Sequence, residues 1–184
     1  MIEITDEQLI EKYLKGDKKS LEVLIKRYLK PIHSFVYKNI GNSEIAEDLT
    51  QEVFVKVWKN LKKPTLSLSK GFDTNHGNFK SWLFTIAKNT SIDFLRKKKK
   101  ETLSLNEDLL FDKSDFIKSL EQKDTLGEVH TALQKLSPNY RAIILLKNEG
   151  ELTFNEIAQK LNEPLNTIKS RYRRALIALK QIIS

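Results

Sequence analysis

The sequence of 184 residues has no cysteine, only six glycines and four prolines, and no long apolar run. Without cysteine the chain has no disulfide, thiolate metal ligand or cysteine nucleophile. Its three histidines, His33, His76 and His130, lie far apart and lack the spacing of metal ligands. No stretch approaches the roughly 18 apolar residues of a membrane span, and the first twenty residues lack a signal-peptide core. We therefore expect a cytoplasmic protein without membrane insertion, metal or other cofactor.

Charge, by contrast, is abundant. The chain carries 32 lysines and arginines against 24 acidic residues, a formal net charge of +8. Such an excess favours a polyanionic partner, although a soluble protein with a basic surface would show the same total.

Residues 1–61 predict four helical stretches. Thr5 to Gln8 has the form of a capping box, opening a helix that ends near Gly16. Helical spacing continues over residues 20–29 and 32–40, with Pro31 interrupting or kinking the helix. Ser43 is a plausible N-cap for the next helix. The apolar residues of that helix step by four and form one stripe: Ile45, Leu49, Val53, Val57 and Leu61.

The rest of the chain predicts a loop, a helix, a linker and a small bundle. Residues 62–78 contain proline, glycine and asparagine and are typical of a loop, after which a helix runs from Phe79 to the basic run at 96–100. Residues 101–124 reverse the sign of the charge, with seven acidic residues against three lysines. Ser137-Pro138 marks a helix start within the last section. We therefore predict an all-α fold of two small helical domains, residues 1–100 and 125–184, joined by an extended acidic linker, residues 101–124.

A helix-turn-helix is indicated near the C-terminus. Thr153 to Glu156 forms a second capping box, and the helix it opens directs Ile157, Ala158 and Leu161 inward. Residues 162–164, Asn-Glu-Pro, end that helix, and a longer one follows from Leu165. Two helices joined by such a short turn form the unit whose second helix fits the DNA major groove.

The two faces of this second helix differ in chemistry. At 100° per residue, one sector is apolar: Leu165, Ile168, Tyr172, Ala175, Leu176 and Leu179. The neighbouring sector is polar or basic and contains Asn166, Lys169, Ser170 and Arg173, with Thr167 and Arg174 just past it. Amide, hydroxyl and guanidinium groups read base edges and bind phosphates. A solvated basic face is the alternative, but the capping box and the turn favour DNA recognition.

Three separated segments resemble one family. "AEDLTQEVFVKVW" (46–58) and "FKSWLFTIAKNTSIDFLRKKKK" (79–100) closely resemble the two diagnostic segments of bacterial RNA polymerase sigma factors. "LSPNYRAIILLKNEGELTFNEIAQKLNEPLNTIKSRYRRAL" (136–176) resembles their C-terminal domain. The two-domain layout looks like the extracytoplasmic-function (ECF) branch of the sigma-70 family. The resemblance implies a non-catalytic subunit that binds core RNA polymerase and directs initiation at specific promoters.

The resemblance also implies a role for the acidic helix. Its segment matches the one that docks on the clamp helices of the largest polymerase subunit, and Asp48, Gln51 and Glu52 lie one turn apart on the side opposite the Val53 stripe. Three acceptors in a row suit arginines on a partner helix. By periodicity alone, these side chains could simply make the helix soluble.

The helix over residues 79–100 matches the element that captures the −10 promoter region as a melted strand. The resemblance places Asn89 against base edges and Lys88 and Arg96 against phosphates. The loop over 62–78 occupies the position of the family's base-capturing loop, with His76 or Asn75 as weak candidates for its pocket. Trp58 and Trp82 lie on apolar stripes, so we expect both in the core rather than stacked on bases.

The C-terminal helix would read the −35 element as duplex. We expect Lys169, Ser170, Arg173 and Arg174 to contact DNA, with Thr167 and Arg171 directed toward phosphates. Asn166 stands where glycine is frequent in the family, so the preferred −35 sequence cannot be transferred. The acidic linker resembles the family's connector, and the resemblance implies an anti-sigma factor as a further partner.

Two other classes of function explain less of the sequence. A stand-alone repressor or activator would use only the C-terminal domain and would leave the acidic helix and residues 79–100 unexplained. A nuclease or nucleotide hydrolase would need a P-loop or clustered carboxylates, and the sequence has neither.

Overall fold

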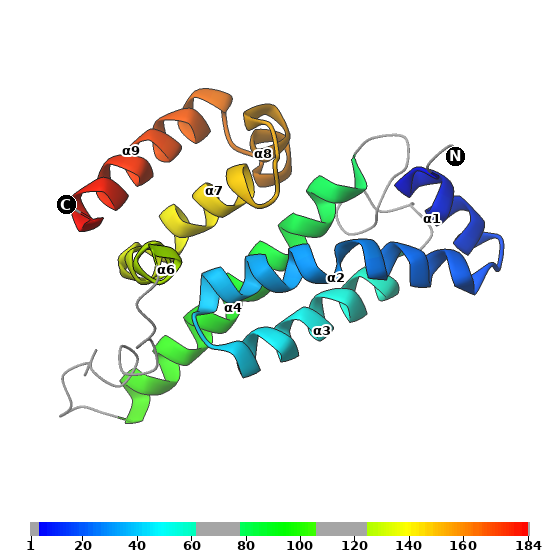
Figure 1. Ribbon diagram of the computed structural model, residues 1–184, viewed down its shortest axis with the longest axis horizontal. Helices are drawn as coiled ribbons and strands as arrows, with labels where there is room; N and C mark the ends of the chain where they lie inside the picture. Colours follow the sequence, from blue (N-terminus) through cyan, green and yellow to red (C-terminus); the bar gives the residue numbers. More distant parts are fainter. Residues whose placement is uncertain (1–3, 62–77, 106–124, 184) are drawn as a thin grey trace.

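The computed structural model describes residues 4–61, 78–105 and 125–183. All regular structure within these ranges is helical, and no strand occurs in them, which confirms the all-α prediction. Figure 1 shows the helices as two groups. The N-terminal bundle comprises α1 (Asp6–Leu14), α2 (Lys18–Ile40), α3 (Ser43–Leu61) and α4 (Phe79–Leu105). The C-terminal bundle comprises α6 (Thr125–Lys135), α7 (Pro138–Asn148), α8 (Phe154–Leu161) and α9 (Leu165–Ile183).

Helix α2 is the central element of the N-terminal bundle and contacts α1, α3 and α4. It runs unbroken through Pro31, so the predicted interruption is wrong. Pro31 is exposed, while Leu24, Tyr28, Ile32 and other residues before and after it lie on one buried face. Burial of apolar side chains on both sides of Pro31 outweighs the one backbone hydrogen bond that proline cannot donate.

The ends of α2 and α3 are fixed by local hydrogen bonds. Gly41 ends α2 in the left-handed conformation with φ 80°, which glycine adopts without steric penalty. Asn42, not Ser43, caps α3, because its Oδ1 accepts from the Ile45 N–H at 2.9 Å. Both residue types suit an N-cap, so sequence alone did not separate two neighbouring candidates.

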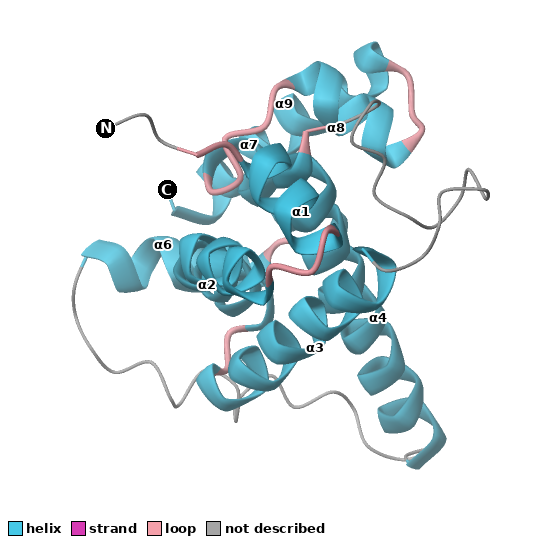
Figure 2. Ribbon diagram, turned by 90° about the vertical axis from the view of Figure 1, so that its right-hand side faces the viewer, coloured by secondary structure: helices cyan, strands magenta, loops and turns pink. Residues whose placement is uncertain are grey.

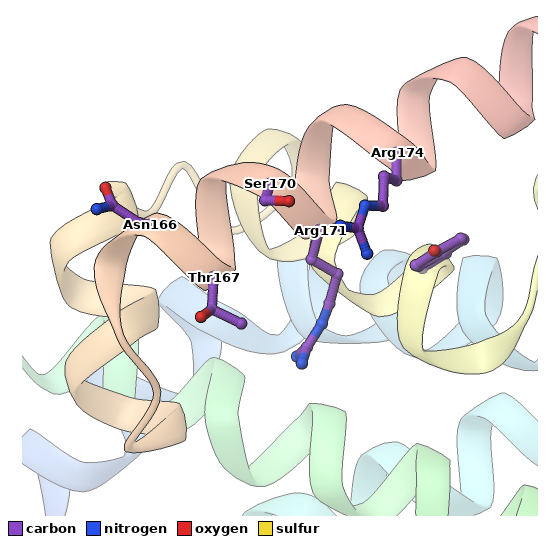
Figure 3. A pocket seen from close by; sticks show the side chains of 6 residues that line it. Asn166, Thr167, Ser170, Arg171 and Arg174 are labelled. Atoms are coloured by element: carbon purple, nitrogen blue, oxygen red, sulfur yellow. The ribbon is translucent and has the colours of Figure 1, made fainter.

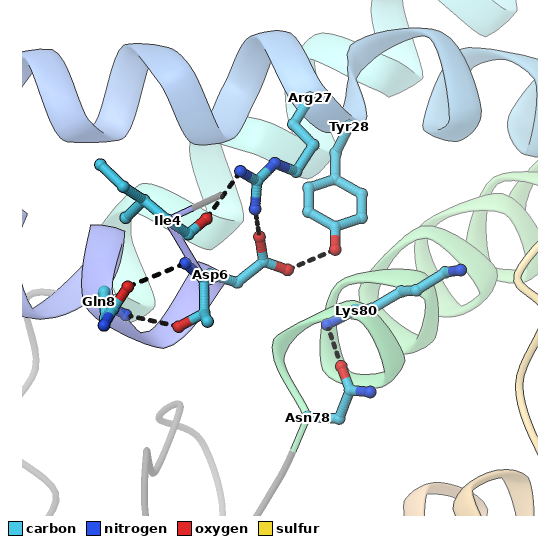
Figure 4. Close-up of polar contacts among 8 residues, drawn as sticks. Ile4, Asp6, Gln8, Arg27, Tyr28, Asn78 and Lys80 are labelled. Atoms are coloured by element: carbon cyan, nitrogen blue, oxygen red, sulfur yellow. Dashed lines mark hydrogen bonds and ion pairs between the residues drawn. The ribbon is translucent and has the colours of Figure 1, made fainter. Parts of the chain in front are cut away.

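Helix α1 is fastened to α2 by a polar cluster, shown in Figure 4. The predicted capping box of Thr5 and Gln8 is present. The Asp6 carboxylate accepts hydrogen bonds from Arg27 and from the Tyr28 hydroxyl. Burial, followed by the neighbouring carboxylate, raises the pKa of Tyr28 well above its usual range, so its hydroxyl remains a donor.

The C-terminal bundle follows the sequence prediction closely. Ser137 caps α7 with Pro138 in its first turn, and Thr153 and Glu156 form the second capping box. Asn162 ends α8 in the left-handed conformation with φ 52°. Helix α9 then starts at Leu165, as predicted.

Two predicted boundaries lie at the edges of the described residues. Helix α4 runs to Leu105, five residues beyond its predicted end at Lys100. The predicted loop, apart from Asn78, and the part of the predicted linker after residue 105 lie outside the described residues, as do His76 and Asn75. The proposed domain boundaries therefore stay predictions.

The two bundles pack directly on each other. Helix α2 contacts α6 and α7, and α4 contacts α7 and α8, so one cluster of buried residues extends through both bundles. Figure 2 shows α6 beside α2 from a second direction. This contact joins residues that are far apart in the sequence, such as Lys80 with Glu151 at 71 positions and Ser34 with Glu149 at 115 positions.

Candidate nucleic-acid interface

The predicted acidic row of α3 lies at the surface. Asp48, Gln51 and Glu52 are exposed, while Leu49 and Val53 on the opposite side are buried. Glu52 forms an ion pair with Lys56 at 2.7 Å, and the Lys56 Nζ also donates to Thr90 Oγ1 on α4 at 2.9 Å. The acidic row is therefore accessible to a partner protein, and Glu52 already forms an ion pair within its own helix.

The two tryptophans differ in burial. Trp82 is half-buried and its ring centroid lies 5.7 Å from that of Phe79, as expected for a core residue. Trp58 is 42% exposed, so its predicted place in the core is wrong. It follows the buried Val57 by 100° of helical rotation, which carries it past the edge of the apolar stripe.

The three predicted −10 residues occupy different environments on α4. Asn89 and Arg96 are exposed, and Arg96 pairs with Asp93 at 3.3 Å. Lys88 is half-buried and faces the C-terminal bundle. Its burial lowers the pKa of its ammonium group, which also lies within range of the charges of Glu163 and Arg171.

The recognition helix α9 has one buried and one exposed face. Ile168 and Ala175 are fully buried. Five of the polar residues singled out in the sequence are exposed: Asn166, Thr167, Lys169, Arg173 and Arg174. Ser170 is half-buried. Leu176 is 40% exposed, so its predicted inward orientation is wrong, and it lies one position beyond the buried stripe.

Arg171 differs from its neighbours on α9. It pairs with Glu163 in the helix-turn-helix turn, at 2.6 Å. Figure 3 shows its side chain directed away from Ser170, toward the helices of the N-terminal bundle. In this arrangement Arg171 is not directed toward the outer face of the recognition helix.

A depression with a volume of about 430 Å³ lies between α7 and α9. Figure 3 shows the side chains that line it. Its lining supplies amide, hydroxyl and guanidinium groups: Tyr140, Asn166, Thr167, Ser170, Arg171 and Arg174. Donors of this kind suit a phosphate oxygen. Tyr140 was not predicted, because it comes from α7 and its sequence position gives no sign that it meets α9.

Within the described ranges no three His, Asp or Glu side chains gather in a way that could hold a metal ion. Nor is any helix there long and apolar enough to cross a membrane.

A helix-turn-helix with an exposed basic face, packed beside a second helical bundle, defines a DNA-binding protein of two modules. Residues 24–101 match Sigma-70 region 2 and residues 126–179 match Sigma-70, region 4. The ECF RNA polymerase sigma factor SigW of Bacillus subtilis is 31% identical over 98% of this chain and 97% of its own. The ECF RNA polymerase sigma-E factor of Escherichia coli K12 is 26% identical over 96% of this chain and 93% of its own.

Solved structures share the fold. CnrH, in complex with the cytosolic domain of CnrY, superposes with a TM-score of 0.70 at 21% identity, covering 97% of this chain and 96% of that one. The sigma factor RpoE of Bartonella quintana superposes with a TM-score of 0.67 at 23% identity, covering 90% and 97%. The chain belongs to the ECF branch of the sigma-70 family, whose non-catalytic members direct RNA polymerase to initiate transcription at specific promoters.

Proposed function

We propose that this sigma factor binds core polymerase through α3, captures the −10 strand through α4 and reads the −35 duplex through α9. The main support for this proposal is that one chain exposes two rows of polar side chains, one on α3 and one on α9. An acidic and amide row lies opposite the buried stripe of α3, and a basic row lies opposite the buried stripe of α9. The first row suits a basic protein surface and the second suits DNA.

On α3, Asp48, Gln51 and Glu52 accept hydrogen bonds from basic side chains of the clamp helices of the largest subunit. Carboxylates form charge-assisted, often bidentate bonds with arginine, which are stronger than neutral hydrogen bonds. The ion pair between Glu52 and Lys56 restricts the Glu52 rotamer before docking, so less side-chain entropy is lost on binding.

On α4, Asn89 contacts base edges of the melted −10 strand while Lys88 and Arg96 neutralise phosphates. Holding flipped bases offsets the few kcal/mol needed to unstack them, which favours melting. On α9, Lys169, Ser170 and Arg173 face base edges of the −35 duplex. Thr167 and Arg174 bind its phosphates, as does Arg171 once its ion pair with Glu163 breaks, and Tyr140 adds a donor at the depression they line.

We also propose an anti-sigma factor as a partner of this cytoplasmic protein. The fold is shared with RpoE of Bartonella quintana, which was solved in complex with the anti-sigma factor NepR. A partner that covers α3 and α9 would prevent both polymerase docking and −35 recognition.

A double charge reversal tests the docking step. Asp48→Arg with Glu52→Arg should abolish co-elution with core polymerase on size exclusion, because like charges then meet at the contact. Glu47→Arg, a change of the same kind at an exposed site on the same helix, should leave co-elution intact. Circular dichroism should show unchanged helix content in both variants. Normal binding by the double variant would refute the assignment of α3.

A further inference from the structure

We propose that Lys56 is a positioning residue, which holds Asn89 on α4 in a defined place relative to the docking row of α3 (Asp48, Gln51 and Glu52). Its ammonium group bridges one carboxylate of that row to a buried hydroxyl beside Asn89. The inference rests on the proposed function for the roles of the docking row and of Asn89. The bridge itself rests on contacts between the two helices.

The bridge joins three side chains on two helices. Lys56 lies one turn after Glu52 on α3, and its Nζ lies 2.7 Å from the Glu52 Oε1. The same Nζ donates to the Thr90 Oγ1 on α4 at 2.9 Å. An ammonium group has three donors, so it can hold both acceptors at once. The docking row is thereby connected to α4 by hydrogen bonds as well as by packing.

Other pairs of the same spacing show how an ordinary surface pair differs from this one. Lys15 pairs with Glu11 at 2.5 Å and Lys26 pairs with Glu22 at 2.7 Å, each within a single helix. The side chains of both lysines are 73% exposed, whereas that of Lys56 is 40% exposed. Lys56 therefore does more than pair with its own helix, because it reaches a buried group on another one.

Thr90 lies at the edge of the buried face of α4. It is 3% exposed, and Ala87 and Ser91 beside it are fully buried. Asn89, the residue before it, is exposed. Because neighbouring residues are separated by a fixed rotation and rise along a helix, the position of Thr90 determines where the Asn89 side chain leaves α4. A bond to Thr90 therefore acts on Asn89 without touching DNA.

Apolar packing between α3 and α4 does not by itself set their exact alignment. Val53 and Val57, one turn before and directly after Lys56, are buried. Their burial drives the helices together, but the hydrophobic effect is non-directional. A hydrogen bond weakens steeply as its distance or angle changes. The bond from Lys56 to Thr90 therefore resists sliding and rotation of one helix on the other.

Docking on polymerase is compatible with the bridge. The side chain of Glu52 is 50% exposed, so a basic group can reach its carboxylate from solvent. An ionised carboxylate has about four acceptor sites on its two oxygens. Lys56 is bound to Oε1, and the remaining sites suit an arginine of the polymerase. A chain of polar contacts then runs from polymerase through Glu52 and Lys56 to Thr90.

Such a connection matters because reading a base requires accurate placement. A binding side chain has to lie within about 0.5 Å of its productive position, and it depends on its neighbours to stay there. Since the docking row is fixed to the enzyme, any looseness between α3 and α4 displaces Asn89 from the melted strand. Loss of the bridge therefore lowers discrimination between −10 bases more than it lowers affinity for polymerase.

A double-mutant cycle tests the bridge in the free protein. Lys56→Met removes the ammonium group and keeps an apolar stem, and Thr90→Val removes the hydroxyl and keeps the side-chain shape. Because both changes break the same bond, the folding equilibrium constant of the double variant should exceed the value expected from the two single changes by at least about threefold. Urea unfolding followed by circular dichroism measures all four proteins. Effects that simply multiply would overturn the bridge.

Base discrimination by the holoenzyme tests the positioning role. The probe is a labelled single strand with the −10 sequence of a start site mapped for this protein, compared with strands that carry one changed base. Lys56→Met and Thr90→Val should each lower the ratio of the two dissociation constants at least about threefold, and the double variant should lower it no further. Lys56→Arg keeps the donors and should retain the ratio. Lys59→Met, at an exposed site on the same helix, is the matched control and should also retain it.

Affinity for core polymerase separates positioning from a general structural defect. Thr90→Val leaves the pair of Glu52 and Lys56 intact, so its affinity for core polymerase should change by less than about twofold. Unchanged discrimination in Lys56→Met and Thr90→Val, or a loss that only follows polymerase affinity or helix content, would overturn the positioning role. If the unmodified holoenzyme does not distinguish the strands, the proposed −10 function falls and the positioning role with it. The unfolding cycle still decides in that case whether the bridge exists.

Discussion

Arg141 illustrates how a single buried cation can join several helices. The C-terminal ends of α2 and α6 carry the partial negative charge of their last carbonyls, and the guanidinium donates to both. Burial lowers the pKa of Arg141 to about 10, so the group remains charged at neutral pH. The favourable helix-end dipoles and hydrogen bonds offset the desolvation of that charge.

Replacing Arg141 with methionine should therefore destabilise the protein. The variant keeps apolar volume but leaves buried carbonyls without donors, and we expect the free energy of unfolding to fall by about 2–4 kcal/mol. Lys135→Met, at an exposed site on neighbouring α6, should change it by less than about 0.5 kcal/mol. Urea unfolding followed by circular dichroism measures both. Similar small effects would show that Arg141 does not hold the helix ends.

His130 should make stability depend on pH. Burial, then the nearby charges of Arg141 and Lys38, lowers the pKa of His130 below 6.5, its value in the unfolded chain. As the pH falls below about 6.5, the unfolded state therefore binds more protons than the folded state. The free energy of unfolding is highest above that pH and decreases as the pH falls toward the pKa of His130 in the folded protein. The ring of Tyr37 stacks on the His130 ring, with centroids 4.8 Å apart.

His130→Phe keeps a ring against Tyr37 and removes the titration. Between pH 7.5 and 5.5 the unfolding free energy of the original protein should fall more steeply than that of the variant, by at most ~1.4 kcal/mol per pH unit. Parallel pH profiles for the two proteins, from denaturant melts at each pH, would contradict this assignment.

At the residue scale, the sequence revealed features set by near neighbours. Both capping boxes were predictable because the partners are three residues apart. Arg141, His130 and Tyr140 were missed because their partners lie on other helices. The docking role proposed for Asp48, Gln51 and Glu52 rests on the family resemblance, since an exposed acidic row is equally typical of an ordinary soluble helix.

At the scale of the element, the periodicity of apolar residues predicted which helices exist. It was less successful at predicting where the buried face of each helix ends. The buried stripes of α3 and α9 were correct at their centres, at Val53 and Ile168. Trp58 and Leu176, at the edges of those stripes, are exposed. A period of 3.6 residues does not state how wide the covering surface is; that width is set by the neighbouring helices.

The basic face of α9 should divide into base-reading and phosphate-binding residues. Arg173→Ala should cost about 1–3 kcal/mol on the preferred −35 sequence if its guanidinium is bidentate to guanine, and should relax specificity at one position. Arg174→Ala should weaken binding about equally on all sequences and reduce the salt slope by about one.

The comparison uses polymerase holoenzyme on a panel of single-base −35 variants at several salt concentrations. Arg174→Ala is the matched control, as both arginines are exposed on the same turn. Equal losses for Arg173→Ala on every sequence would place Arg173 among the phosphate contacts.

At the scale of the whole molecule, the reversal of charge over residues 101–124 predicted two helical modules but not their contact. That contact pairs Lys38 with Glu149 and Lys80 with Glu151, residues separated by 111 and 71 positions. Charge pairs between residues so far apart in the sequence produce no periodic pattern that a single sequence could reveal. The fold class and order of elements could therefore be predicted, whereas the packing of one bundle on the other required the structure.

We propose that the chain directs polymerase to promoters through two DNA readers and one docking helix. The most direct measurement is run-off transcription with purified bacterial core polymerase on genomic fragments, with the start sites mapped. We expect discrete starts, each preceded by two shared sequence elements at fixed spacing, and the loss of these starts with Asp48→Arg and Glu52→Arg. Transcription no different from that of core polymerase alone, or starts without shared elements, would contradict it.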